Sequence, residues 1–308
     1  MPPLAATVQV PATSANLGPG FDCLGLALNL YLRVSCQTGG DGLRIHASDP
    51  EIATDAGNLV FRAIEAAFEA AGQPVPALEL DIDNGIPLSR GLGSSSAAII
   101  GGVALANALL GEPFDRDRLL EIALPLEGHP DNIAPALFGG LAVSSVDGDR
   151  VLAVPVRLRR PPRIVLFIPD FKMSTAEARR VLPDSVPRAD AIFNTGRSSL
   201  LVAALAAGDF SVLRWAMDDR LHQPYRGAIF PALPKLIEAA LEAGAAGCAM
   251  SGAGSTVIAF CEGDTKDVAA AFGRAASAAH LNGRSAMAEI DTRGARLVRS
   301  PLPPTGGA

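Results

Sequence analysis

Gly91-Leu92-Gly93-Ser94-Ser95-Ser96-Ala97-Ala98 gives the strongest indication of both fold and chemistry in this chain. Two glycines lead into three hydroxyl side chains, and an uncharged, alanine-rich run follows as far as Gly111. This run predicts a helix, and the alternation of Leu78, Leu80 and Ile82 with charged residues predicts a strand before the loop. The amides of the loop and the positive end of the helix would then converge on one point, where a phosphate is stabilised.

The pattern differs from the two best-known phosphate-binding motifs, because no Lys-Ser/Thr pair follows the glycines and the spacing G-x-G-x-x-G does not occur here. A glycine turn followed by a serine N-cap is the structural alternative, and many proteins use it without binding phosphate. The run up to Gly111 is also long enough for a membrane span of ~20 residues. Three serines at its start, Asn107 within it and the lack of a flanking basic cluster argue against a span.

Composition excludes further classes of function. The 308 residues carry a formal net charge of −6 and only three lysines, so a nucleic-acid partner is not expected, and phosphate must be neutralised by arginine, backbone or metal. The four cysteines lack metal-binding or redox spacing, and the N-terminal residues lack the features of a signal peptide. These features predict a cytoplasmic protein with reduced thiols and no membrane partner.

The order of predicted elements favours an α+β fold with two domains. Strands are expected at 4–11, ending at Pro11, at 26–36 and at 42–47, with a shaped loop at 12–22. Helices are expected at 58–71 and from Phe114 until Pro125 interrupts the second one, and a hairpin is expected at 141–154. The proline- and arginine-rich segment 155–162 marks a boundary, so the predicted domains are residues 1–158 and 159–308.

The second half continues with alternating elements. A strand is expected at 164–168, and Ser174 and Glu177 form a capping box that opens a short helix. Further elements are two or three helices within 188–243, strands at 248–250, 256–260 and 286–290, and a helix at 265–280. The tail 301–308 is expected to be frayed.

Four polar clusters stand out against the apolar background, and their order carries a family resemblance. They are 16–22 (NLGPGFD), the glycine–serine loop, 127–132 (EGHPDN) and 251–256 (SGAGST). The chain resembles the GHMP-type small-molecule kinases, and within that superfamily it is most similar to the homoserine kinases. Residues 10–25 and 127–140 carry the closest match, and matching pieces extend from about Val8 to Phe260.

The resemblance implies an N-terminal α/β domain with the phosphate loop and a C-terminal ferredoxin-like α/β plait. It implies transfer of the γ-phosphoryl group of ATP, with Mg²⁺, to the hydroxyl of L-homoserine in threonine biosynthesis, by a homodimer. Phosphoryl transfer mainly requires in-line positioning and charge neutralisation, so a site needs an anion cradle, a divalent metal and groups that orient the acceptor.

On the nucleotide side, the resemblance implies that one loop wraps the phosphates of ATP. Its residues are Pro87, Leu88, Ser89, Arg90, Gly91, Leu92, Gly93, Ser94, Ser95, Ser96 and Ala97. Ser95 and Glu127 are the candidate magnesium ligands, and Asn58 is a weaker candidate for a contact with adenine. Relatives often carry two acidic residues as Glu-x-Glu-Gly, whereas Pro125 occupies the first position here and only Glu127 remains.

On the acceptor side, the resemblance implies a pocket for an ammonium, a carboxylate and a hydroxyl. Asn16 and Asp22 would hold the hydroxyl and ammonium end, and His129 and Asn132 would line the same pocket. Three further side chains would bind the carboxylate: Thr175, Arg179 and Arg226. Gly252 would close the site with the backbone amides of 251–256. The implied catalytic residues are Asn16, Asp22, Asn132 and Arg179.

Related kinases place an aspartate where this chain has Asn132, so no general base is evident. We expect direct attack by a hydroxyl polarised by Asn16, because a loose transition state needs little prior deprotonation.

Each assignment also has a structural alternative: Asn16 as a turn residue, Asp22 as a cap, Arg179 on a helix surface and Arg226 in a solvated turn. Asp131 is interpreted as a helix N-cap, and His46, His222 and His280 are interpreted as structural. A kinase for mevalonate or a sugar, or a non-catalytic nucleotide-binding protein, are the alternative functions.

Overall fold

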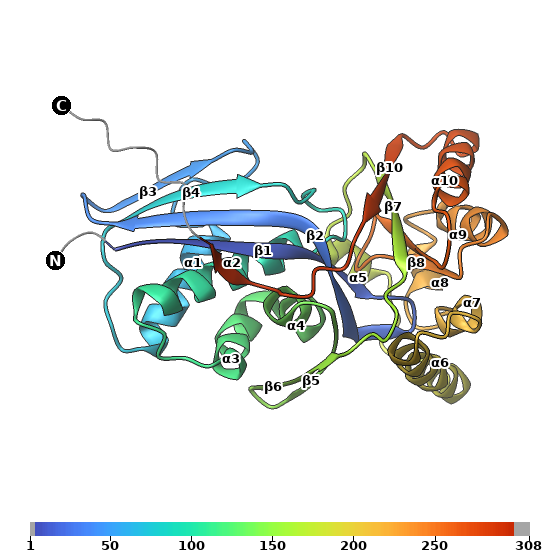
Figure 1. The fold of residues 1–308 in the computed structure, drawn as a ribbon, viewed down its shortest axis with the longest axis horizontal. Coiled ribbons are helices and arrows are strands. Elements are labelled where there is room, and N and C mark those ends of the chain that lie inside the picture. Colours follow the sequence, from blue (N-terminus) through green and yellow to red (C-terminus); the bar gives the residue numbers. More distant parts are fainter. Residues whose placement is uncertain (1–3, 299–308) are drawn as a thin grey trace.

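The computed structural model describes residues 4–298, and the predicted frayed tail at 301–308 lies outside the described residues. The chain forms two halves, each with its own sheet, that meet where β1, β2 and β7 approach one another (Figure 1). Each sheet carries helices, so the α+β prediction is confirmed.

The N-terminal half is a seven-stranded sheet with the path β11-β1-β2-β4-β3, extended by β5 and β6 beside β2. All pairings are antiparallel except β3 with β4. The strands are β1 (Ala5–Asn16), β2 (Gly20–Thr38), β3 (Leu43–Ala47), β4 (Leu78–Asn84), β5 (Leu141–Asp147), β6 (Arg150–Val156) and β11 (Arg296–Val298). Four helices cover one face of this sheet: α1 (Leu59–Ala70), α2 (Ser94–Leu109), α3 (Arg116–Glu127) and α4 (Pro130–Phe138).

The uncharged run that follows the phosphate loop is helix α2, which is buried among α1, α3, α4 and the sheet. Its small residues permit close approach, since a Cβ on Gly102 would lie 2.3 Å from the carbonyl oxygen of Val60. Burial on all sides explains why the helix needs no polar face. Within residues 4–298, no helix is long and apolar enough to cross a lipid bilayer.

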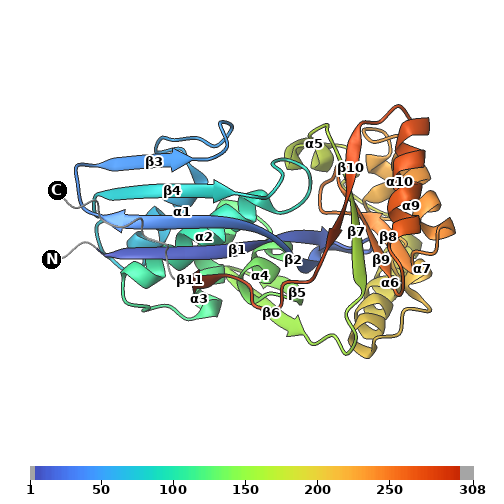
Figure 2. The same cartoon turned by 45° about the horizontal axis from the view of Figure 1, so that its top comes forward.

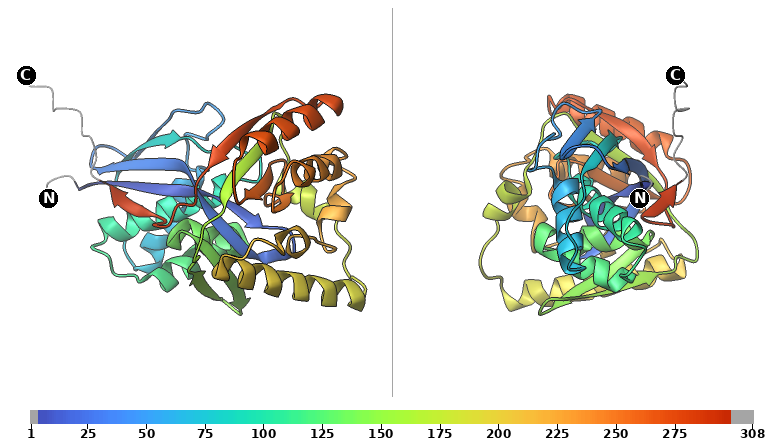
Figure 3. Two further views of the ribbon diagram at one scale, coloured as in Figure 1. Left: turned by 45° about the vertical axis from the view of Figure 1, so that its right-hand side comes forward. Right: turned by 90° about the vertical axis from the view of Figure 1, so that its left-hand side faces the viewer.

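The C-terminal half is a four-stranded antiparallel sheet of order β10-β7-β9-β8. Its strands are β7 (Arg163–Pro169), β8 (Gly247–Met250), β9 (Val257–Cys261) and β10 (Gly283–Ala288). Its helices are α5 (Thr175–Arg180), α6 (Arg188–Ala207), α7 (Leu213–Ala216), α8 (Gln223–Arg226), α9 (Leu233–Glu242) and α10 (Lys266–Ala278). Helices α9 and α10 lie on the face turned away from the N-terminal half (Figure 3). The succession of strands and helices is that of a ferredoxin-like plait, as predicted.

Several elements differ from the prediction. Strand β1 does not end at Pro11 but continues to Asn16, because a register shift between Pro11 and Ala12 accommodates the missing N–H and pairing with β2 resumes. Helix α3 is not interrupted at Pro125; it runs to Glu127 and ends at Gly128, whose φ is 87°. Residues 188–243 hold four helices, two of them only four residues long.

The end of the described chain also departs from the predicted domain division at 159–308. After β10 the chain returns to the N-terminal half, where β11 pairs with β1 through Thr7 and Val298 (Figure 2). The backbone bridge between Leu28 and Ile290 lies on this return path. The N-terminal sheet therefore contains residues from both predicted domains.

Candidate active site

The glycine–serine loop is shaped by its neighbours so that its amides remain free. Gly93 has φ 67°, and a Cβ there would lie 1.8 Å from the Thr13 hydroxyl; Gly91 has φ 72°, and a Cβ there would lie 2.2 Å from the Ser251 carbonyl oxygen. Hydrogen bonds to two carbonyl groups fix the loop in place. The carbonyl of Leu92 accepts from the Thr13 amide, and the carbonyl of Gly91 accepts from the Ser251 hydroxyl. In the described chain, no acceptor binds the amides of residues 91–96, which leaves an anion cradle at the start of α2.

The loop lines a cavity of about 500 Å³ to which both halves of the chain contribute. Five of its lining residues are apolar and are called the apolar end here: Leu32, Ile52, Leu59, Val60 and Ile82. Five polar lining residues are linked by short contacts and are called the polar end: Asn16, Asp22, His129, Asp131 and Arg179. This combination of groups suits a ligand with a flat apolar part, phosphates and a further polar group.

Glu127 and the loop serines form the candidate metal site. Both Ser95 and Ser96 donate hydrogen bonds to the same carboxylate oxygen of Glu127, the Ser95 bond at 3.2 Å. Burial raises the pKa of Glu127 above 4.5, although Ser96 and the charge of His129 partly lower it. Pro125 is exposed, so the carboxylate that faces the loop is the one that the sequence retains. Hydroxyl and carboxylate oxygens are the donors that Mg²⁺ prefers, so these residues fit that ion.

At the polar end, Asp22 and Arg179 form a two-point ion pair at 2.6 and 3.0 Å. Each side chain is about one third exposed. The sequence assigned them to opposite ends of the acceptor, whereas in the structure they bind each other. Arg179 also lies over the ring of Phe21, with 5.3 Å from its Cζ to the ring centroid. The position of Arg179 therefore depends on residues of the N-terminal half.

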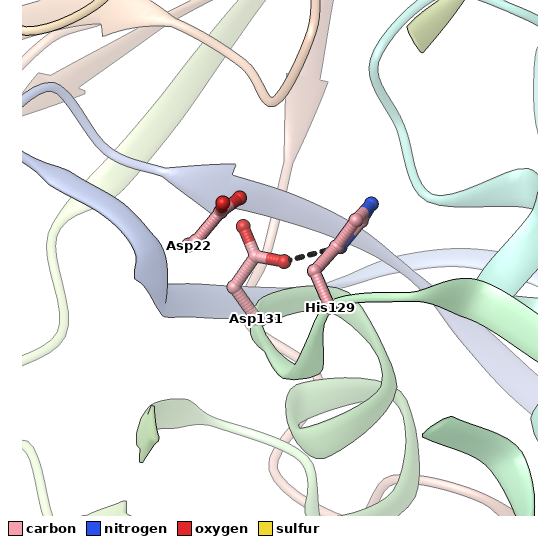
Figure 4. Close-up of side chains that lie close together, drawn as sticks. All are labelled: Asp22, His129 and Asp131. Atoms are coloured by element: carbon pink, nitrogen blue, oxygen red, sulfur yellow. Dashed lines mark hydrogen bonds and ion pairs between the residues drawn. The ribbon is translucent and has the colours of Figure 1, made fainter. Parts of the chain in front are cut away.

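Asp131 is the functional candidate that the sequence interpretation missed. It is not the N-cap of α4, which is His129; it lies in the first turn, 2% exposed, and binds Nδ1 of His129 at 2.7 Å. Asp22, His129 and Asp131 each have a ligand atom within 4.8 Å of those of the other two. Figure 4 shows the carboxylates of Asp22 and Asp131 facing each other, with His129 beside Asp131. The only signal for Asp131 in the sequence was its position in the spacing His-x-Asp-Asn.

Charge in this cluster is set by the pair of Asp131 and His129. Burial lowers the pKa of His129, but the hydrogen bond and charge of Asp131 outweigh burial and raise it above 6.5. The Nε2 atom of His129 lies 3.9 Å from the Glu127 carboxylate. Two carboxylates, Asp22 and Asp131, thus face a region that suits an ammonium group.

Asn16 ends β1 with a positive φ and is hydrogen-bonded within the protein. Asn16, Leu17 and Asp22 have φ of 68°, 51° and 56°, values that non-glycine residues rarely adopt. The Asn16 amide nitrogen donates to the carbonyl of Gly252, and its oxygen accepts from the amide of Asp22. Asn16 therefore positions Asp22 and Gly252, and it also lines the cavity.

The predicted closure by amides of 251–256 is wrong for Gly252. Its amide donates to the carbonyl of Ala15, and the amides of Ser251, Gly254 and Thr256 also have partners within the protein. It is the carbonyl of Gly252 that faces polar groups, accepting from Asn16 and from Arg226.

Arg226 is 1% exposed, so the alternative of a solvated turn residue is wrong. Its side chain donates to the carbonyls of Ala178 and Gly252 and contacts Nδ1 of His222 at 3.0 Å. Burial, followed by the charge of Arg179, lowers the pKa of Arg226 to about 10, so it remains protonated at neutral pH. Arg226 lines the cavity beside Asp22, as expected for a carboxylate-binding residue.

Several nucleotide-side assignments are corrected. Arg90 donates through all three guanidinium nitrogens to the carbonyls of Leu88, Pro169 and Asp170, so it joins the two halves and is not available to phosphate. Ala97 is fully buried, and its amide donates to Gly93. Three residues of the predicted loop do not line the cavity: Pro87, Ser96 and Ala97.

The other assigned residues border the cavity. Asn58 caps α1 by accepting from the amides of Val60 and Phe61, so its oxygen is already used. Asn132 accepts from the Thr13 hydroxyl at 2.7 Å, which places it directly under Gly93. Thr175 is exposed at the start of α5, after the predicted capping residue Ser174.

Comparisons with known proteins agree on one family. Residues 58–140 match the GHMP kinases N terminal domain, and residues 201–281 match the GHMP kinases C terminal domain. Homoserine kinase of Microchaete diplosiphon is 46% identical over 273 residues, covering 87% of this chain and 88% of that protein. Homoserine kinase of Trichormus variabilis is 43% identical over 298 residues, covering 94% and 98%.

A solved structure gives the same result. The crystal structure of homoserine kinase from Cytophaga hutchinsonii superposes with a TM-score of 0.87 at 28% identity, covering 96% of this chain and 97% of that one. The family matches lie on the phosphate loop and on the second half of the chain. By sequence and by fold, this chain belongs to the homoserine kinase family within the GHMP kinases.

Proposed function

We propose that the chain is an ATP-dependent kinase that phosphorylates the side-chain hydroxyl of L-homoserine, giving O-phospho-L-homoserine for threonine biosynthesis. The observation that carries this proposal is one cavity that is lined by free loop amides, by apolar side chains and by a cluster of two carboxylates and two arginines. An amino acid with a terminal hydroxyl is zwitterionic and matches such a cluster, whereas mevalonate and sugars offer no ammonium group.

The nucleotide is held by the chain in two ways. The apolar end accepts the base, and the amides of 91–96 bind the phosphates without protein acceptors competing for them. Ser95 and Glu127 would hold Mg²⁺, which neutralises charge on the phosphates when bound. Their present hydrogen bond keeps both oxygens at the loop.

The acceptor is oriented by charge. Its ammonium lies against Asp22 and Asp131, and its carboxylate binds Arg226 and Arg179, which places the hydroxyl toward the loop. Arg179 then exchanges part of its contact with Asp22 for the substrate. The reaction needs no general base in this proposal, since Asn132 cannot accept a proton and Asp131 is bound to His129. The aligned hydroxyl oxygen therefore attacks the γ-phosphorus of ATP, the bond from that phosphorus to the bridging oxygen breaks, and ADP leaves. The proton of the hydroxyl passes to the transferred phosphoryl group.

An assay of ADP release with a panel of alcohols tests this function. L-homoserine should stimulate release far more than L-serine, mevalonate or galactose. ATP binding by calorimetry without stimulation by any alcohol would support the non-catalytic alternative instead, and a better response to mevalonate would identify another kinase of the fold.

Location and assembly are further parts of the proposal. All four cysteines are free, as expected for the reducing cytoplasm. The homodimer is proposed from the family resemblance, and its test is the mass in solution by light scattering.

A further inference from the structure

His222 occupies a buried position beside the acceptor end of the cavity. It is 0% exposed, and its two ring nitrogens contact Gly18 and Arg226. Nε2 lies 2.7 Å from the carbonyl oxygen of Gly18, which can only accept, so Nε2 carries the hydrogen. Nδ1 lies 3.0 Å from Nη1 of Arg226, and a guanidinium can only donate. Both partners therefore require the same neutral tautomer, in which Nδ1 is the acceptor.

The surroundings support the neutral form. Burial lowers the pKa of His222 to about 4, and the charge of Arg226 acts in the same direction, whereas Asp219, Asp22 and the bond to Gly18 oppose it. The Asp219 carboxylate lies 3.5 Å from Nε2, the nitrogen that carries the hydrogen in this tautomer. It also accepts from the amides of Leu221, His222 and Gln223 and from the side chain of Asn194. The imidazole is therefore held at the start of α8 in a fixed orientation.

The neutrality of His222 has a consequence for Arg226. The side chain of Arg226 contacts only uncharged acceptors, the carbonyls of Ala178 and Gly252 and the imidazole of His222. Within residues 4–298, no carboxylate lies within ion-pair distance of Arg226, whereas Arg179 is paired with Asp22. Arg226 is thus oriented without being neutralised, and its positive charge remains available to a ligand.

His222 also supports the aromatic ring below the two arginines. Its ring stacks on Phe21 with 5.2 Å between centroids and 28° between planes. The Cζ atoms of Arg226 and Arg179 lie 5.6 and 5.3 Å from the centroid of the same ring. The imidazole therefore fixes Arg226 by a hydrogen bond and Phe21 by stacking.

We propose that His222 is a positioning residue for recognition of the acceptor's carboxylate, because it holds the unneutralised guanidinium of Arg226 toward the cavity through Nδ1. This inference rests on the proposed function, since it specifies how the same pocket selects an amino acid. It predicts that loss of the Nδ1 acceptor weakens recognition of the carboxylate and leaves the rest of the reaction intact.

Two conservative variants separate the two nitrogens. In His222→Asn the side-chain oxygen can take the place of Nδ1, and in His222→Gln the side-chain amide nitrogen can take the place of Nε2. The acceptors are L-homoserine and 3-aminopropan-1-ol, which has the same chain without the carboxylate. His46→Gln is the matched control, because the side chain of His46 is 63% exposed and lies outside the cavity lining.

We expect His222→Gln to lower kcat/KM for homoserine at least tenfold through KM, with the value for 3-aminopropan-1-ol and the KM for ATP within twofold of the unaltered protein. His222→Asn should retain most of the preference for homoserine over 3-aminopropan-1-ol. His46→Gln should retain all of this preference. An equal fall with both acceptors indicates a merely structural histidine and overturns the inference, as does no change with either.

A measurement on the unaltered protein covers the case in which the variants do not fold. Nitrogen NMR of the imidazole at pH 7 should give the neutral tautomer protonated at Nε2, and an imidazolium or the other tautomer overturns the inference. Lack of homoserine-dependent ADP release by the unaltered protein would instead count against the proposed function, so the two failures are distinguishable.

Discussion

Asp22 and Arg179 lie 157 positions apart in the sequence and bind each other through both carboxylate oxygens and both terminal guanidinium nitrogens. Asp22 lies near the start of β2, and Arg179 lies in α5 of the C-terminal half. The hydrogen bonds that Arg179 donates to Asp22 raise the pKa of Arg179, so the arginine stays charged. A zwitterionic acceptor offers each member of this pair the same type of partner that it already has.

Asp22→Asn should raise the KM for homoserine about 10- to 100-fold and change the KM for ATP less than threefold. The loss of one charged hydrogen-bond partner corresponds to about 1.5–3 kcal/mol, and asparagine tolerates the left-handed φ of this position. Steady-state kinetics with both substrates varied checks this, and Asp184→Asn on the surface is the control. Abolished turnover with unchanged homoserine affinity would instead indicate a catalytic carboxylate.

Gly93→Ala should destabilise the protein and weaken ATP binding more than Gly111→Ala does. Both glycines have positive φ, 67° and 82°, but a Cβ meets the Thr13 hydroxyl at position 93 and nothing within 4 Å at position 111. The strain alone costs about 1–2 kcal/mol, and overpacking adds about 1–3 kcal/mol. Urea unfolding and ATP titration measure the two effects, and equal losses for the two variants would contradict the role assigned to Gly93.

Activity should require more Mg²⁺ as the pH falls toward the raised pKa of Glu127. Below that pKa the carboxyl is protonated and no longer a good ligand, and burial sets the pKa above 4.5. In the ligand-free protein the same shift makes the folded state less stable as the pH rises from 4.5 through the raised pKa, because the folded state retains the proton longer. Glu127→Gln should remove the pH dependence of the Mg²⁺ requirement, whereas Glu69→Gln on the surface of α1 should preserve it.

Asn132→Asp should lower kcat even though it introduces a residue that can accept a proton. The amide nitrogen of Asn132 lies 3.5 Å from the Asp131 carboxylate, and its oxygen accepts from Thr13. A second carboxylate there repels Asp131 and the incoming phosphates, which outweighs any gain in basicity. The measurement is kcat against pH for both proteins, and a higher kcat in the variant would show that a general base is useful in this site.

Local signals in the sequence predicted most elements and the phosphate loop. The 58–71 helix, the 141–154 hairpin and the Ser174 cap all depend on neighbours within a few residues, and all are found in the structure. The prediction failed at Pro11, where a long-range pairing with β2 continues past a residue that locally ends a strand.

The candidate site shows the same difference between features set by local sequence and features set by long-range contacts. Backbone positions such as Gly91 and Gly93 are recognisable from a motif, because a positive φ and a close contact leave few other residues possible. Asp131 was misinterpreted because a capping aspartate and a buried carboxylate have the same local spacing. The tasks of Arg90 and Asn16 depend on carbonyls that lie 79 and 236 positions away, which no local pattern encodes.

The return of β11 to β1 links synthesis of the chain to its folding. The first strand to leave the ribosome has an open hydrogen-bonding edge until residues 296–298, almost the last described, have been made. The N-terminal half therefore cannot be completed during translation until the C-terminal half has been made, and a shortened chain lacking this segment would leave the first strand open to pairing with other molecules.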